Sequence, residues 1–171
     1  MSNLRIDRKI CDCAMWCHLT ILSGEPLIVF ILALFPSILP QYPRVEQNLN
    51  IFFGFLFFSP LLGCILSTIL AMMIWRKNRH RHQFIEASGK EVINFLLSVS
   101  LYLFMVDTIM ILGSYGFAYA DVPEPILYFY ILGVLVNLLL LVNTLWLTIK
   151  ASLHATRGNM YHYPFVIRFL R

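Results

Sequence analysis

The sequence predicts an all-α membrane protein in which four helices cross the bilayer and both chain termini lie on the cytoplasmic side. Three observations lead to this prediction. Of the 171 residues, 59% are hydrophobic and 13% are charged, whereas about 25% of the residues in ordinary soluble domains are charged. Four apolar stretches are long enough to cross a hydrocarbon core of about 30 Å. The Lys and Arg residues are concentrated in alternate connections between these stretches.

The four predicted spans occupy residues 14–39, 51–75, 92–120 and 126–149. Each is long enough and apolar enough to cross the membrane as a helix. The connections are too short for a separate soluble domain, so one integral membrane domain is expected to cover residues 1–171. The first span follows Arg5, Arg8 and Lys9, as a signal peptide would. Its apolar core is longer than a signal's and no small-residue cleavage motif follows, so we expect it to be retained.

The basic residues set the predicted orientation, because Lys and Arg accumulate on the cytoplasmic side of short connections. Twelve of the thirteen lie in three segments: the N-terminal segment 1–13, the connection 76–91 and the tail 150–171. Only Arg44 falls on the opposite side, where the short connection 121–125 has no base. We expect the middle connection to anchor the second and third spans and to face anionic lipid headgroups, not nucleic acid. Its bases are Arg76, Lys77, Arg79, Arg81 and Lys90, and the first four are taken to set the topology.

Three short motifs stand out: CHLT at 17–20, ASGKEVINF at 87–95 and YHYPFVIRFL at 161–170. Ser88 lies three residues before Glu91 and ahead of an apolar run, which is the pattern of a capping box, so the third helix is predicted to begin at Ser88. In order and topology, the motifs resemble the signatures of a family of small bacterial four-helix membrane proteins of unknown function. The matching positions are Trp16, His18, Gly89, Lys90, Glu91, Asn94, Phe95, Tyr163, Pro164, Ile167, Arg168 and Phe169.

This resemblance implies a location in the bacterial cytoplasmic (inner) membrane. The resembled family is similar to the Tic-twenty component of the chloroplast inner-envelope protein translocon, which implies a part in moving or assembling proteins. The chain departs from the family pattern in its longer first outer loop, residues 40–50, and in Ser59-Pro60, where Gly-Pro is common. These departures leave open whether a partner is shared with the family.

The C-terminal tail has two open interpretations. Gly158-Asn159 predicts the end of the fourth helix, and a mixture of aromatic and basic residues follows. Such a mixture suits the headgroup zone, where Arg168 and Arg171 would meet anionic lipid. The alternative is that the tail packs against the basic connection 76–91. Both place it on the cytoplasmic face.

Polar side chains within the predicted spans are further candidates, because a carboxylate at mid-bilayer requires a partner or water. They are Glu25, Asp107, Asn137 and Asn143. Asp107 shares a seven-residue repeat with two serines of the third span, and Asn137 lies on a polar stripe of the fourth, so we expect a polar seam between these two helices. The seam is either a proton or ion pathway, or a carboxyl held neutral by hydrogen bonds. On the second span, Gly63, Ser67 and Ala71 predict a close-packing face.

No catalytic motif is present, so we expect no enzymatic activity and no cofactor. Cys11, Cys13, Cys17 and His18 form a single cluster instead of the two separated pairs of a structural zinc site, so no metal is predicted and reduced or acylated thiols are favoured. We expect a structural or accessory subunit of a larger membrane assembly, with other membrane-protein subunits as partners. One alternative is a component of protein translocation or membrane-protein assembly. Another is a proton-coupled or ion-conducting protein that uses Glu25 and Asp107.

Overall fold

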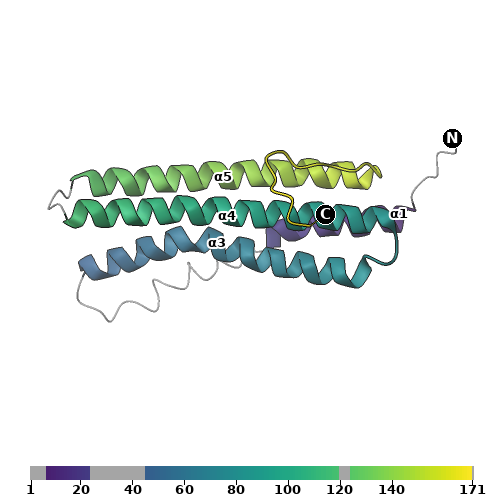
Figure 1. Cartoon of the computed structure of the whole chain (residues 1–171), viewed down its shortest axis with the longest axis horizontal. Coiled ribbons are helices and arrows are strands. Elements are labelled where there is room, and N and C mark those ends of the chain that lie inside the picture. Colours follow the sequence, from purple (N-terminus) through teal and green to yellow (C-terminus); the bar gives the residue numbers. More distant parts are fainter. Residues whose placement is uncertain (1–6, 24–44, 120–123, 171) are drawn as a thin grey trace.

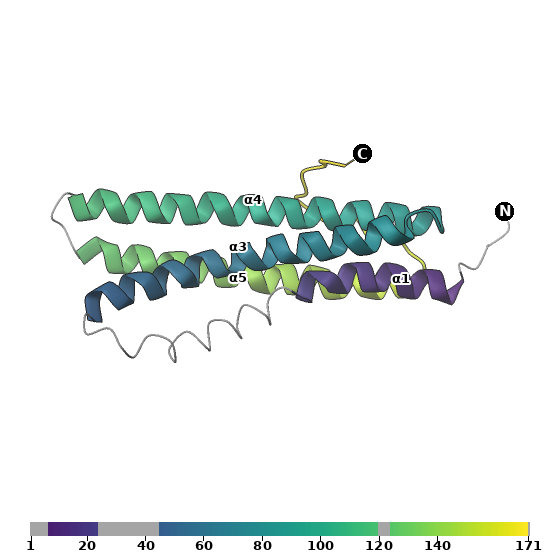
Figure 2. The same cartoon turned by 90° about the horizontal axis from the view of Figure 1, so that it is seen from below.

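The computed structural model describes residues 7–23, 45–119 and 124–170. These residues form helix α1 (Arg8–Leu19), a 3-10 turn η1 (Thr20–Ser23) and the long helices α3 (Val45–Asn78), α4 (Gln83–Tyr119) and α5 (Glu124–Thr156), with no strand among them. The three long helices run side by side along the long axis of the molecule (Figure 1). Helix α1 lies along the end of α5 that leads into the tail (Figure 2). The all-helical prediction is confirmed.

Three of the described helices are long and apolar enough to cross a membrane. Their spans are Pro60–Asn78, Gln83–Gly113 and Ile131–Thr156, which lie in α3, α4 and α5. The predicted first span, residues 14–39, is described only as far as Ser23. The rest of that span, including Glu25, lies outside the described residues. The structure therefore gives three crossing helices in the part of the chain that it describes, where the sequence predicted four.

The helix ends differ from the predicted ones. An apolar stretch shows which residues can lie in the hydrocarbon core, but it does not show where the helical hydrogen bonds stop. Helix α3 runs to Asn78 and α4 begins at Gln83, so only residues 79–82 of the predicted connection 76–91 are non-helical. Helix α1 begins at Arg8, inside the segment 1–13 that was predicted to precede the first helix. Helix α5 continues past the predicted residue 149 to Thr156.

The predicted capping box at Ser88 is wrong. Ser88 lies inside α4, where it is buried and its hydroxyl donates to Met160 Sδ over 3.6 Å. The start of α4 is capped instead by His82, whose ring Nδ1 accepts a 3.1 Å hydrogen bond from the backbone N–H of Phe84. An imidazole nitrogen satisfies one of the unpaired N–H groups of the first turn, as a Ser or Asp side chain usually does.

The long helices exceed the thickness of a bilayer core. They contain 34, 37 and 33 residues, which correspond to about 50–55 Å at 1.5 Å per residue. A hydrocarbon core is about 30 Å thick, so each helix has roughly 20 Å to spare for tilt or for the interfacial zone. Helix α1 and the tail lie against only one end of this bundle (Figures 1 and 2).

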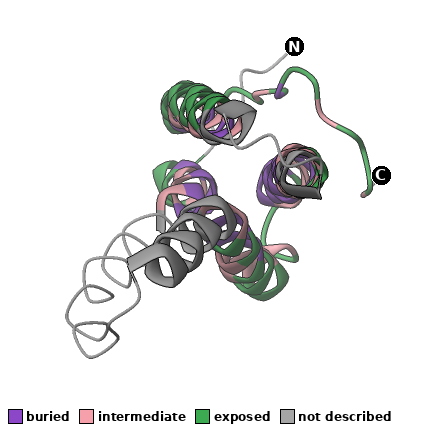
Figure 3. Cartoon of the chain, turned by 90° about the vertical axis from the view of Figure 1, so that its left-hand side faces the viewer, coloured by how far each residue is buried: buried purple, intermediate pink, exposed green. Residues whose placement is uncertain are grey.

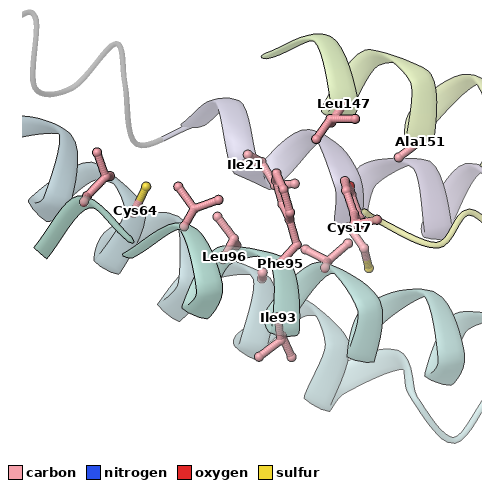
Figure 4. Close-up of a cluster of buried hydrophobic side chains, with 13 residues drawn as sticks. Cys17, Ile21, Cys64, Ile93, Phe95, Leu96, Leu147 and Ala151 are labelled. Atoms are coloured by element: carbon pink, nitrogen blue, oxygen red, sulfur yellow. The ribbon is translucent and has the colours of Figure 1, made fainter. Parts of the chain in front are cut away.

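The core lies where α1, η1, α3, α4, α5 and the tail meet. Its largest cluster includes Cys17, Ile21, Cys64, Phe95 and Leu147 (Figure 4), and Tyr163 of the tail also belongs to it. The predicted small-residue face of α3 is buried, and the Ser67 hydroxyl donates to the Ile21 carbonyl over 3.2 Å. The buried residues lie on the sides of the helices that face the middle of the bundle, and the exposed ones lie on the outer sides (Figure 3). Many exposed side chains are large and apolar, which suits contact with lipid tails.

The Trp75 ring of α3 packs directly against Gly89 of α4. A Cβ added there would overlap Cδ1 of Trp75 and would lie 2.7 Å from its Cγ. The Trp75 indole also donates from Nε1 to the Glu86 carbonyl over 3.1 Å, which fixes the ring against α4. Gly89, a residue of the second motif, is therefore required by packing, because any side chain would displace this ring.

We predict that Gly89→Ala lowers the free energy of unfolding by about 1–3 kcal/mol, the usual effect of overpacking. Thermal unfolding in detergent measures this change. Gly116→Ala is the matched control, since its added Cβ meets nothing within 4 Å, and it should leave the midpoint unchanged. In a Trp75→Leu background the additional effect of Gly89→Ala should disappear. An equal loss in both backgrounds would contradict the proposed contact.

Candidate functional site

The second and third motifs meet where the tail folds back onto α4. Helix α5 ends with Gly158 at φ 73°, a left-handed conformation that glycine adopts without steric cost. The N–H of Gly158 donates to the Ala155 carbonyl and that of Asn159 to the His154 carbonyl, both over 3.0 Å. These two bonds satisfy the last carbonyls of the helix and turn the chain back. The predicted stop at Gly158-Asn159 is confirmed.

Asn94 holds the end of the tail with both sides of its amide. Its Oδ1 accepts from the backbone N–H of Phe169 over 3.1 Å and from that of Leu170 over 2.8 Å. Its Nδ2 donates to the Leu170 carbonyl over 2.9 Å. Asn94 is only 3% exposed, so these bonds form in a largely dry environment, where an unpaired amide would be costly.

Two hydroxyls continue this contact along α4. The Ser98 hydroxyl accepts from the Ile167 N–H over 2.9 Å and donates to the Asn94 carbonyl over 2.8 Å. The Tyr102 hydroxyl donates to the Phe165 carbonyl over 2.9 Å. Asn94, Ser98 and Tyr102 are four residues apart and so share one helix face. We call these three residues the polar ladder. Sequence reasoning missed Ser98 and Tyr102, although their spacing from Asn94 was a usable signal.

The first motif reaches the same site through His18. The ring Nδ1 of His18 lies 2.8 Å from the Tyr163 hydroxyl, and both side chains are buried. Either the hydroxyl donates to Nδ1, or Nδ1–H donates to the hydroxyl, depending on the tautomer. Burial raises the pKa of Tyr163 well above its ordinary value, so the hydroxyl keeps its proton. The Tyr163 ring also stacks on Phe95, with centroids 4.1 Å apart and planes at 12°.

The remaining motif residues lie around the edge of the site. Glu91 contacts His162 of the tail, with Oε1 2.9 Å from Nδ1. Lys90 pairs with Glu86 on its own helix over 2.9 Å. Trp16 is 61% exposed. Pro164 and Arg168 are also exposed.

The tail therefore packs on the side of α4, and its contacts with Ser88 and Glu91 are with residues of the predicted connection 76–91, as the second interpretation of the tail expected. Its outer surface combines the exposed side chains of Phe165, Ile167 and Phe169 with Arg168. This mixture is compatible with the headgroup zone, and contact with anionic lipid stays a prediction.

The four topology-setting bases of the middle connection do not join the site. Arg76, Lys77 and Arg81 are exposed, and Arg79 places its guanidinium 5.3 Å from the centroid of the Trp75 ring. Arg76 and Lys77 lie in the last turn of α3, where a positive charge is favourable.

Of the intramembrane polar residues, two are brought together. Asn137 Nδ2 donates to Asp107 Oδ1 over 3.2 Å and to the Gly133 carbonyl over 3.1 Å, linking α5 to α4 as the predicted seam requires. Asn143, by contrast, is exposed on the outer face of α5 and has no hydrogen bond to a described residue. Glu25 lies outside the described residues.

The cysteines of α1 do not converge on a metal site. Cys11 and Cys17 are buried and Cys13 is partly buried, and all are free thiols. In residues 7–23, 45–119 and 124–170, no three His, Cys, Asp or Glu side chains come together in a way that could hold a metal ion. Burial raises the pKa of Cys13, and nearby Arg81 partly offsets that rise.

Comparison with known proteins gives one family match. Residues 45–170 match the family model described as the magnetosome magnetite crystal formation protein family. The match covers α3, α4, α5 and the tail, with two of the three motifs, but it does not reach His18. No curated protein and no solved structure matches the chain. The expected relation to the chloroplast translocon is not shown by these findings.

We predict that Asn94→Leu releases the end of the tail, because it removes three hydrogen bonds to residues 169 and 170. Hydrogen exchange followed by mass spectrometry should show at least about tenfold faster exchange at the amides of Phe169 and Leu170, which corresponds to a loss of about 1.4 kcal/mol of local stability.

The matched control is Asn143→Leu, the same substitution at an exposed amide on α5, which should leave exchange in the tail unchanged. If Asn94→Leu also leaves it unchanged, the polar ladder does not hold the tail.

Proposed function

Because the chain belongs to the MamF/MmsF family of magnetosome magnetite crystal formation proteins, we propose that it is a non-enzymatic, multi-pass membrane protein that acts as a structural subunit of the membrane assembly in which such crystals form. The residues of the motifs supply the main support. Catalytic residues usually converge on a cleft that a substrate can enter. Here Asn94 of α4 hydrogen-bonds Leu170 of the tail, and Phe95 of α4 stacks on Tyr163 of the tail. The motifs therefore serve to hold the chain together.

The proposed partner surface is the outer face of α5. Leu132, Leu139 and Trp146 recur at seven-residue intervals and are 49%, 69% and 59% exposed. Asn143 lies on the same side, and together these four residues form what we call the α5 face. Asn143 is near the middle of the span Ile131–Thr156. In hydrocarbon, an amide without a partner is costly, and interhelical hydrogen bonds from Asn promote helix association. We propose that a neighbouring helix supplies a hydrogen-bonding side chain to Asn143.

The proposed orientation places both termini, the connection 79–82 and the tail in the cytoplasm. Its support is the distribution of bases, since twelve of thirteen lie in the segments assigned to that side. The exposed apolar side chains of the tail would then lie at the cytoplasmic interface, with Arg168 near anionic headgroups. No observation on the described residues favours translocation or ion conduction, so we put forward no second function.

We predict that an impermeant maleimide labels intact cells at a cysteine introduced by Asp121→Cys and spares one introduced by His80→Cys. The native cysteines are first replaced by alanine, and neither substitution removes a Lys or Arg. The basic residues near His80 should keep that connection in the cytoplasm. After permeabilisation, His80→Cys should react. The opposite labelling pattern would overturn the proposed orientation.

The structural role is tested in a bacterium that forms magnetite crystals and carries this chain in place of its own family member. We expect the Asn143→Leu variant to remain in the membrane but to lose at least about 80% of the membrane proteins that co-purify in gentle detergent. The reason is that Leu cannot form the proposed hydrogen bond to a neighbouring helix. Crystal number or size, measured by electron microscopy, should change in the same strain.

Asn143→Gln is the control, since it keeps an amide at this position and should retain both the partners and the crystals. If Asn143→Leu changes neither, the α5 face contacts only lipid. If removing the whole chain leaves the crystals unchanged, the proposed function is wrong.

A further inference from the structure

The pair formed by Asp107 and Asn137 leaves two oxygen atoms unsatisfied. Asp107 is 1% exposed and Asn137 9% exposed, and they are joined by the bond from Asn137 Nδ2 to Asp107 Oδ1. Asp107 Oδ2 and Asn137 Oδ1 are also buried, and within the described residues neither has a hydrogen-bond partner. Most buried polar atoms do have a partner, so two such atoms in one pair require an explanation.

Both unsatisfied atoms are acceptors when the carboxyl is ionised. A carboxylate has no donor, and the amide oxygen of Asn137 is an acceptor in any state. A single proton on Asp107 Oδ2 changes this, because a neutral carboxylic acid carries one O–H donor. An acid and a primary amide are then complementary: the amide N–H donates to the acid, and the acid O–H donates to the amide oxygen. The first of these two bonds is present.

We infer that Asp107 and Asn137 form a proton-binding site in which Asp107 is a neutral acid that donates from Oδ2 to Asn137 Oδ1. A small pocket beside Asn137 is lined mostly by apolar side chains and not by Asp107, so it does not supply the polar partners that a bridging water needs. The inference goes beyond the proposed structural role of the chain, because it assigns a ligand, the proton, to the contact between α4 and α5.

Charge favours the proton over a water molecule alone. One water could donate to both free oxygens, but it would leave a negative charge inside a membrane-crossing helix. Such a charge is costly without a partner. The residues that line the pocket beside Asn137 on α3, α4 and α5 include no Lys, Arg or His, and Cys64 is the one titratable residue among them. A bound proton removes the charge.

A metal cation fits this site less well than a proton. Na⁺ and Ca²⁺ in proteins are surrounded by several oxygen ligands, about six to eight for Ca²⁺. The described side chains near the pair offer Asp107 Oδ2, Asn137 Oδ1 and the Thr144 hydroxyl, which already donates to the Leu140 carbonyl over 2.8 Å. These side-chain oxygens from α4 and α5 are too few to surround such a cation. A proton needs only the oxygen that carries it and one acceptor.

The direct test is infrared spectroscopy of the full chain in lipid vesicles at pH 7. Subtracting the spectrum of Asp107→Asn cancels the other carboxyl groups. We expect the difference spectrum to contain the C=O band of one neutral carboxylic acid, shifted to lower frequency in D₂O, and to lack the paired bands of a carboxylate. Carboxylate bands in place of the neutral acid band would overturn the proposal.

Thermal unfolding provides a second, independent readout. In Asp107→Asn, the new amide N–H replaces the acid O–H, so both bonds to Asn137 persist and the unfolding midpoint should stay within about 1 °C of the wild type. Asp107→Leu removes the bond to Asn137 Nδ2 and leaves Asn137 Oδ1 without a donor, while the bond to the Gly133 carbonyl remains, and it should lower the midpoint by several degrees. Equal losses in the two variants would contradict the acid–amide pair. A midpoint that rises on adding NaCl but not choline chloride, and only when Asp107 is present, would show that the site holds a metal cation instead.

Discussion

An irregular segment beside a membrane must find partners for its backbone N–H and C=O groups. In this chain that segment is the tail, and the side chains that pair with its backbone also decide how α1, α4 and the tail are joined. The tail has no helix or sheet of its own, so its backbone is paired by side chains of the polar ladder. Because the tail is held there, Tyr163 stacks on Phe95 of α4 and hydrogen-bonds His18 of α1, and it thereby links α1 to α4. The end of the bundle thus depends on contacts between residues far apart in the sequence.

Much of the fold could be predicted from the sequence, and the errors have a common cause. Long apolar runs identify α3, α4 and α5, because only a helix can satisfy its backbone in hydrocarbon. Hydropathy does not show where these helices end, since the end of each one is decided by packing and by capping. Ser88 has the sequence pattern of a cap, but the tail buries it within α4, and His82 takes that role. A local pattern carries no information about a segment that returns later in the chain.

The site was predictable to a similar degree. The motifs identified His18, Asn94, Phe95 and Tyr163 but gave no reason for their association. Ser98 escaped notice because a hydroxyl in an apolar helix usually bonds the carbonyl four residues earlier, as Ser98 does, and its second bond, to Ile167, is tertiary. Asn137 and Asn143 looked alike in the sequence. Six residues at 100° each place them about 120° apart around α5, so one faces Asp107 and the other faces outward.

The polar ladder also has a consequence for how the chain is made. Asn94 and Leu170 are 76 positions apart, so at about 5–20 residues per second the partner of Asn94 is synthesised roughly 4–15 s after Asn94 itself. During that interval the Asn94 amide and the Tyr102 hydroxyl of α4 lack their partners in the tail, while the Ser98 hydroxyl has only its bond to the Asn94 carbonyl. The insertion machinery, a lipid headgroup or water must pair with these groups until the tail is made. This end of the protein therefore closes only after residues 165–170 have left the ribosome, so the contacts of the polar ladder are among the last that these helices can form.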